Sequence, residues 1–267
     1  GLIEIPLYHH SISGSGIEKS GITTLCQRID AIIVSGEGVR FIYLDFWHIF
    51  DGHSAAPFWP MQTKIEKISP LSALAIKNID EVSQNGTDFL SFREKLSFAN
   101  ISHPEKKMEW KGARIAIKDA LDCILLPYPG FYKDENGKSH PMDGYGHVSM
   151  THTKGLAAAI FHKEMPVGID LDYVREKVVR LGPKFLDQHE IDFLGNDPLI
   201  NTIAWSAKES IFKCQGRRGV SLKNHIRLNP FTLQDNVISG RVENTEFSDH
   251  HYKVKIEWQN DRALKSR

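Results

Sequence analysis

Two stretches in the second half of the chain decide the fold: VGIDLD at residues 167–172 and WSAKESIFK at residues 205–213. The first alternates apolar residues with small or acidic ones, which predicts a strand at Val167–Tyr173. The second lies in a longer run that predicts a helix at Pro198–Gln215, ended by Gly216. A strand and a long helix of this kind are typical of a sheet with a helix packed on one face.

The segments on either side extend this mixture of short strands and helices. Strands are predicted at Ala31–Val34, Arg40–Ile49, Ser72–Ile79, Val148–Thr151, Ile226–Leu228, Val237–Val242 and Tyr252–Trp258. Helices are predicted at Asp88–Phe98, Trp110–Leu125 and Gly182–Leu194, and a loop at Tyr128–Gly146. Gly155–His162 is rich in alanine, but the turn and strand after it favour a hairpin over a helix. The fold class is therefore α+β.

Composition and charge exclude several classes of protein. Lys plus Arg and Asp plus Glu both number 33 in 267 residues, so no general attraction to nucleic acid or to an anionic membrane is expected. No apolar run reaches the roughly 18 residues of a membrane helix. The three cysteines are far apart and form no CxxC pair, which excludes a zinc ribbon and favours the reducing cytoplasm.

Two pairs of charged residues are the main candidates for chemistry. Asp170 and Asp172 lie two residues apart on the predicted strand, so both carboxylates face one side, where Mg²⁺ can join them. Glu209 and Lys213 lie one helical turn apart; Glu209 can be a third ligand or a base, and Lys213 can hold a phosphate. Taken alone, each pair is explained more simply as solvated surface charge.

Two further patterns can bind phosphate groups. Basic residues lie around Trp110, namely Lys106, Lys107, Lys111, Arg114 and Lys118. Ser149, Thr151 and His152 place hydroxyls and an imidazole at the end of a predicted strand. Taken alone, an ordinary solvated helix and a structural histidine are again the simpler explanations.

The order of these patterns is more specific than any one of them. A basic helix, a Gly-Lys-x-x-Pro loop, Ser-x-x-His, Gly-Ile-Asp-x-Asp and Trp-x-x-Lys-Glu-x-x-x-Lys follow one another along the chain. This order resembles the surfactin-synthetase (Sfp) type of 4′-phosphopantetheinyl transferase from about Ile68 to Trp258. FLDQHEIDFL resembles the family's intervening helix, with Glu190 at its usual acidic position.

The resemblance implies a fold and a reaction. The implied fold is a pseudo-twofold pair of similar subdomains, each a small antiparallel sheet packed with a long helix, with coenzyme A bound between them. The implied reaction moves 4′-phosphopantetheine from coenzyme A to a serine of an acyl or peptidyl carrier protein and releases adenosine 3′,5′-bisphosphate. The pathway would be fatty acid, polyketide or peptide biosynthesis. A non-catalytic carrier-binding domain and another Mg²⁺-dependent phosphate-processing enzyme stay open as alternatives.

The resemblance also implies roles by position. Asp170, Asp172 and Glu209 would be the ligands of Mg²⁺, with Mn²⁺ as an alternative. The catalytic residues would be Asp170, Glu209 as a possible base, and Lys213 on the pyrophosphate. The implied contacts with coenzyme A are Lys111, Arg114, Lys138, Thr151, His152 and Lys213. The chain departs from the family in having Asp172 where Glu is common, and Thr151 and Thr153 in place of serines.

Three segments are expected along the chain. Residues 1–60 would be an upstream segment or linker, 61–146 an N-terminal subdomain and 147–260 a C-terminal subdomain. Because the sequence starts at Gly1 rather than at Met, the first segment is interpreted as the possible tail of a preceding synthase domain. A monomer or a domain of a larger synthase is expected. A carrier protein could dock on the loop with Arg217, Arg218, Val220, Leu222 and Lys223, but a plain surface loop explains it equally well.

Overall fold

The computed structural model describes residues 27–35, 63–82, 86–244 and 247–260. One sheet of these residues has the strand order β2 (Lys64–Ser69), β3 (Ser72–Asn78), β7 (Leu156–His162), β6 (His147–Thr153). A second has the order β8 (Val167–Tyr173), β1 (Gln27–Ser35), β11 (Phe247–Asn260), β10 (Val237–Asn244), β9 (Ile226–Leu228). A separate hairpin joins β4 (Phe131–Lys133) to β5 (Ser139–Pro141). All of these pairings are antiparallel.

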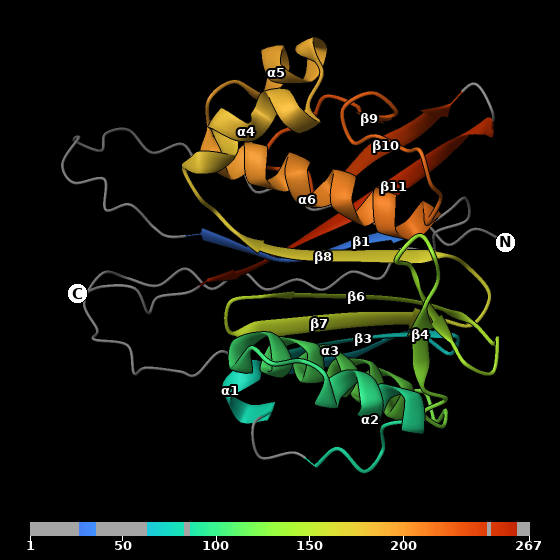
Figure 1. Ribbon diagram of the computed structural model, residues 1–267. Helices are drawn as coiled ribbons and strands as arrows, with labels where there is room; N and C mark the ends of the chain where they lie inside the picture. Colours follow the sequence, from blue (N-terminus) through green and yellow to red (C-terminus); the bar gives the residue numbers. More distant parts are fainter. Residues whose placement is uncertain (1–26, 36–62, 83–85, 245–246, 261–267) are drawn as a thin grey trace, which may run out of the picture.

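A long helix covers each of the two larger sheets. Figure 1 shows α3 (Pro104–Cys123) along the sheet that contains β3 and β7, and α6 (Pro198–Gln215) along β8. The short helices α1 (Ile79–Val82) and α2 (Phe92–Ala99) lie beside α3, and α4 (Lys177–Phe185) and α5 (Gln188–Leu194) lie on the side of α6 (Figure 1). The mixed α+β class with small antiparallel sheets is therefore confirmed.

The two sheets meet through apolar side chains, so the layers run helix, sheet, sheet, helix (Figure 1). Ile76 and Ile160 of one sheet pack in one buried cluster with Ile169 and Leu171 of β8. Because strand residues alternate between faces, Asp170 and Asp172 are on the side of β8 that faces α6.

Glycine is required where α6 crosses β8. A Cβ built on Gly168 would lie 2.0 Å from the carbonyl oxygen of Ser210 and 2.8 Å from the backbone nitrogen of Cys214. The helix backbone therefore lies directly on the strand, with no side chain between them. This close approach sets the distance between the acidic strand residues and the helix that carries Glu209 and Lys213.

The predicted hairpin of Gly155–His162 with Val167–Tyr173 is wrong in its pairing. β7 is a strand, but it pairs with β3 and β6, while β8 pairs with β1 in the other sheet. Every residue of β7 is buried, as befits a strand that lies inside a sheet and between layers. The turn after His162 leads from one sheet to the other.

The predicted helix at Gly182–Leu194 is two helices. α4 ends at Phe185, and Asp187 begins α5 with a capping box in which Asp187 and Glu190 bind each other's backbone N–H groups. The capping box of Ser91 and Glu94 likewise delays the start of α2, predicted at Asp88, to Phe92.

Other predicted boundaries also changed. α3 begins at Pro104, earlier than the predicted Trp110, because proline is favourable in the first turn. The predicted loop at Tyr128–Gly146 contains the β4–β5 hairpin. The strand β2 was not predicted, and the predicted strand Arg40–Ile49 lies outside the described residues.

The strand pairing crosses the predicted subdomain limits. β6 and β7 lie after residue 146, but β7 pairs with β3 of the predicted N-terminal subdomain, and β1, from the predicted upstream segment, lies between β8 and β11. The subdomain limits stay a prediction, and these sheets favour a division in the turn between β7 and β8. Within the described residues, none of the helices is both long enough and apolar enough to span a bilayer.

Candidate active site

A cleft of about 680 Å³ is lined by residues of both sheet-and-helix units. Its walls come from α3, the β4–β5 hairpin, β6, β8 and α6. The cleft receives most of the side chains that the sequence singled out: Arg114, Lys138, Thr151, His152, Asp170, Asp172, Glu209 and Lys213. Lys111, which is buried on α3 with 7% of its surface exposed, is not among the lining residues.

Lys213 and Asp170 form the centre of the cleft. The Lys213 ammonium lies 2.7 Å from Asp170 Oδ1, 3.1 Å from the Ile169 carbonyl oxygen and 3.2 Å from Thr151 Oγ1. The Thr151 hydroxyl donates to the same Asp170 oxygen at 3.2 Å. These contacts bring together α6, β8 and β6, which are far apart in sequence.

Asp172 and Glu209 flank this centre. Asp172 Oδ1 accepts hydrogen bonds from Arg175, at 2.9 Å, and from the Tyr173 backbone N–H, at 2.8 Å. Burial raises the pKa of Asp172, and the charge of Asp170 raises it further. Burial and Asp170 also raise the pKa of the Glu209 carboxyl, against the opposing effect of Lys213. Asp170 therefore disfavours the charge of each of the other two carboxylates.

These three side chains are chemically suited to a divalent cation. Carboxylate oxygens are the ligands that Mg²⁺ prefers, and a cation would relieve their mutual repulsion. Among the described residues, no three acidic, histidine or cysteine groups already stand together as a metal-binding cluster. Instead, Lys213 and Arg175 each occupy one oxygen of the two aspartates. The three carboxylates therefore fit Mg²⁺ as ligands. In this structure Lys213 and Arg175 neutralise the charges of the two aspartates.

Arg114 forms the opposite, cationic wall. Its guanidinium lies over the Trp110 ring, 4.1 Å from the centroid, and its Nε is 3.3 Å from Glu94 Oε1. The Tyr128 hydroxyl donates to the same Glu94 oxygen at 2.8 Å. Burial lowers the pKa of Arg114, while Tyr128 and Glu94 oppose this shift. An arginine held in this way is suited to phosphate recognition.

Sequence reasoning missed Lys133, which lines the same cleft. Burial lowers the pKa of this lysine, and the positive charges of Arg114 and Lys213 lower it further. Cations that repel one another in a partly buried cleft favour an anionic ligand. The available signal was Asn136-Gly137, a common hairpin turn, which lies between Lys133, the last residue of β4, and Lys138, the residue before β5.

Lys138 closes one end of the cleft. Its ammonium donates to the carbonyl oxygens of Lys213, at 3.1 Å, and of Cys214, in the last turn of α6. A Cβ on Gly216, whose φ is +61°, would lie 2.1 Å from Lys138 Cδ, so glycine makes room for the lysine. The expected contact of Lys138 with a nucleotide would require it to leave these carbonyls.

His152 lies on β6 and faces charged residues of α3. Its Nδ1 is 3.3 Å from Glu109 Oε2, and the same oxygen pairs with Lys106 at 2.8 Å. Burial lowers the pKa of His152, Glu109 opposes this, and Lys106 and Lys213 add to it. Glu109 therefore holds the imidazole at the cleft wall.

A comparison with known families gives a match in the second half of the chain. Residues 166–264 match the family model of the 4′-phosphopantetheinyl transferase superfamily, and the matched segment contains Asp170, Asp172, Glu209 and Lys213. No curated protein matches the chain. The matched segment is similar to 4′-phosphopantetheinyl transferases, a class that transfers phosphopantetheine to carrier proteins.

Proposed function

We propose that this chain is an Sfp-type 4′-phosphopantetheinyl transferase, which modifies a serine of an acyl or peptidyl carrier protein. The observation that carries the proposal is a single cleft with acidic residues on β8 and α6 and basic residues from α3, the hairpin and α6. Coenzyme A carries its charge as phosphates, so a cleft with both a metal-type carboxylate group and several cations suits it.

The Sfp subtype is supported by the architecture of this chain. Two units, each an antiparallel sheet covered by one long helix, occur in one polypeptide, and the cleft takes residues from both. We propose that the two units are related by a pseudo-twofold axis and act as a monomer. The carrier loop beyond α6 and the cytoplasmic location stay predictions from the sequence.

In the proposed reaction the carrier serine Oγ bonds to the β-phosphorus of coenzyme A. The bond from that phosphorus to the oxygen bridging to the α-phosphate breaks, and adenosine 3′,5′-bisphosphate leaves. The serine proton passes to Glu209, whose carboxylate lines the cleft. Lys213 leaves Asp170 to contact the pyrophosphate, and Arg114, Lys133 and His152 hold the remaining phosphate oxygens.

Asp170, Asp172 and Glu209 would hold Mg²⁺, or Mn²⁺, which supplies positive charge to the pyrophosphate. The protein otherwise contributes mainly by positioning both substrates, because phosphoryl transfer asks little covalent chemistry of it.

Release of adenosine 3′,5′-bisphosphate from coenzyme A tests the proposal. We expect release only when Mg²⁺ and an apo carrier protein are both present. Release without any carrier would favour a phosphohydrolase instead. No release with several carrier types, although coenzyme A binds, would favour a non-catalytic carrier-binding domain.

A further inference from the structure

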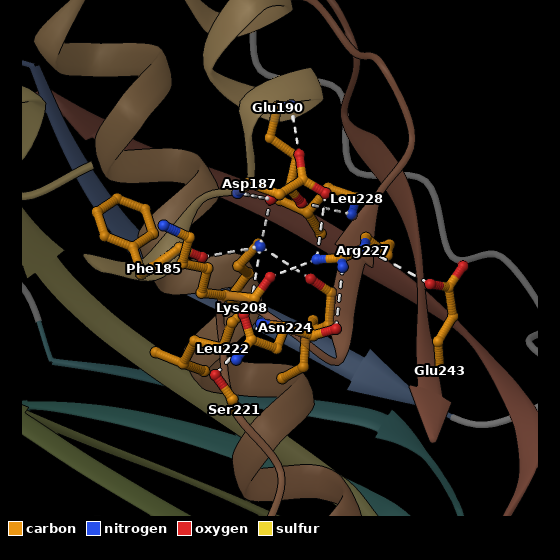
Figure 2. A network of polar contacts seen from close by, with 12 residues as sticks. Phe185, Asp187, Glu190, Lys208, Ser221, Leu222, Asn224, Arg227, Leu228 and Glu243 are labelled. Carbon is orange, nitrogen blue, oxygen red and sulfur yellow. Dashed lines mark hydrogen bonds and ion pairs between the residues drawn. The ribbon is translucent and has the colours of Figure 1, made fainter. Parts of the chain in front are cut away.

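Lys208 lies beside Glu209 on α6, about 100° further round the helix, and points into the protein. Its side chain is 0% exposed. The ammonium contacts Glu190 Oε2 at 2.5 Å and the carbonyl oxygens of Phe185, Leu222 and Ile226 at 2.9, 2.9 and 2.8 Å (Figure 2). A buried ammonium needs such compensation, because burying it unpaired would be very costly.

Glu190, the partner of Lys208, also binds the backbone of two other elements. Its Oε1 accepts the Leu228 backbone N–H at 2.9 Å, and its Oε2 accepts the Asp187 backbone N–H at 3.0 Å (Figure 2). The pair of Lys208 and Glu190 therefore ties α6 to the end of α4, the start of α5 and the edge strand β9.

The segment from Leu222 to Ile226 is held from two sides. Lys208 binds the carbonyls at its two ends, and Arg227 binds the carbonyls of Lys223 and Asn224 between them (Figure 2). Arg227 is fixed in turn by Asp187, at 3.1 Å. Lys208 therefore contacts a segment whose position is also fixed by Arg227.

Glu209 has no comparable support of its own. Within the described residues no hydrogen bond or ion pair holds its carboxylate; Lys213 and Asp170 act on it through their charges. Its place in the cleft is therefore set by the backbone of α6, which is fixed at Gly168 on one side and at Lys208 on another.

We propose that Lys208 is a positioning residue for the transfer reaction: its buried contacts with Glu190 and the 222–226 segment set the position of α6 that places Glu209 in the cleft. This inference rests on the proposed function, in which Glu209 acts on the metal and on the serine proton. Such a pair is weak evidence for stability, since apolar replacements of both partners are often tolerated, but it defines one arrangement of the elements it joins.

The test uses Lys208→Met, Glu190→Gln and the double variant that combines these two substitutions. Val254→Ala is the control to which all three are compared. Removing Lys208 alone leaves a buried carboxylate unpaired, so the double variant keeps the measurement interpretable if the single variant folds poorly. Val254 is fully buried in the core that packs on α6 but makes none of the contacts of Lys208, so its truncation is a matched loss of packing.

We expect the double variant, per folded molecule, to lose kcat at least about 10-fold, the usual effect of removing a residue that orients a metal ligand. KM for coenzyme A should stay within about twofold, because its proposed phosphate contacts other than Lys213 come from α3, the hairpin and β6. Amide hydrogen exchange in residues 205–213 should become faster. Lys208→Arg should restore part of kcat, and Val254→Ala should keep wild-type kcat.

A folded double variant with wild-type kcat would overturn the positioning role, as would an equal loss of kcat in Val254→Ala. If the wild-type chain itself transfers nothing to any carrier, the proposed function fails, and this inference fails with it. The two failures are distinguished by the wild-type measurement.

Discussion

At the scale of single residues, Asp170 is the carboxylate on which the charges of the cleft converge. Lys213 and Thr151 both contact its Oδ1, and its charge raises the pKa of Asp172 and of Glu209. It is also 7% exposed, so little water competes for it. Removing it should affect both the metal and the lysine.

We expect Asp170→Ala to lower the rate of adenosine 3′,5′-bisphosphate release at least about 100-fold, the size of losing a key charge stabiliser. Asp192→Ala, an exposed carboxylate on α5, is the matched control and should keep its rate. Circular dichroism verifies that both variants are folded. Near-normal turnover of Asp170→Ala would contradict the assignment of this residue.

His162 predicts how stability depends on pH. Its Nδ1 accepts the backbone N–H groups of Glu164 and Met165, both at 3.0 Å, and burial lowers its pKa below the ordinary 6.5. The unfolded chain then binds a proton at a higher pH than the folded chain does. The contribution of neutral His162 to the free energy of unfolding is therefore complete above about pH 6.5. It is lost as the pH falls toward the lowered pKa.

His162→Asn keeps an acceptor at the Nδ1 position but does not titrate. Urea unfolding at pH 7.5 and pH 5 should therefore show a smaller loss of stability in the variant than in the wild type. His147 and His152 also have lowered pKa values and contribute to the remaining loss. An identical loss in both proteins would show that His162 does not contribute.

At the scale of elements, the contact of α6 with β8 depends on Gly168. We expect Gly168→Ala to destabilise the protein by about 1–3 kcal/mol, the usual cost of overpacking, and to lower transfer activity by moving α6. Gly182→Ala on α4 is the control, because its new Cβ would be 3.5 Å from the nearest atom. Thermal unfolding and turnover measure both variants, and equal behaviour of the two would refute the close-contact argument.

The end of α3 carries a backbone conformation that suits glycine. Leu125 has φ 59° and a 90% exposed side chain, and the Leu126 N–H binds the Leu121 carbonyl oxygen at 3.0 Å. We expect Leu125→Gly to stabilise the protein by about 0.5–1 kcal/mol, because the strain is removed and little packing is lost.

The same substitution within a helix is the comparison for Leu125. Leu181→Gly, at a 37% exposed position inside α4, should destabilise by about 1 kcal/mol. Urea denaturation gives both values, and a loss of stability at Leu125 would disprove the strain there.

Local sequence patterns predicted most helices and strands, but they could not predict which strands pair with one another. The strand with Asp170 and the helix with Glu209 follow from period and from breakers such as Gly216. The split of α4 from α5 was missed although Asp187 and Glu190 have capping-box spacing. The pairing of β1 with β8 and β11 carries no local signal, because it joins segments more than a hundred residues apart.

At the scale of the whole molecule, the cleft depends on contacts between the two units. Thr151 of β6 reaches Asp170 of β8, and Lys138 of the hairpin reaches the end of α6. The sequence motifs named most of the cleft residues in chain order, but Lys133, Glu109 and Arg175 entered only through the fold. Lys111, whose helix was predicted, is buried and does not line the cleft, and sequence spacing did not show which face of α3 is buried.

The most direct measurement is the intact mass of an apo carrier protein after incubation with this chain, coenzyme A and Mg²⁺. We expect a gain of one phosphopantetheine group, which is lost when EDTA removes the metal and when the carrier's acceptor serine is replaced by alanine. An unchanged mass across acyl and peptidyl carriers, with the wild-type chain folded and coenzyme A bound, would contradict it.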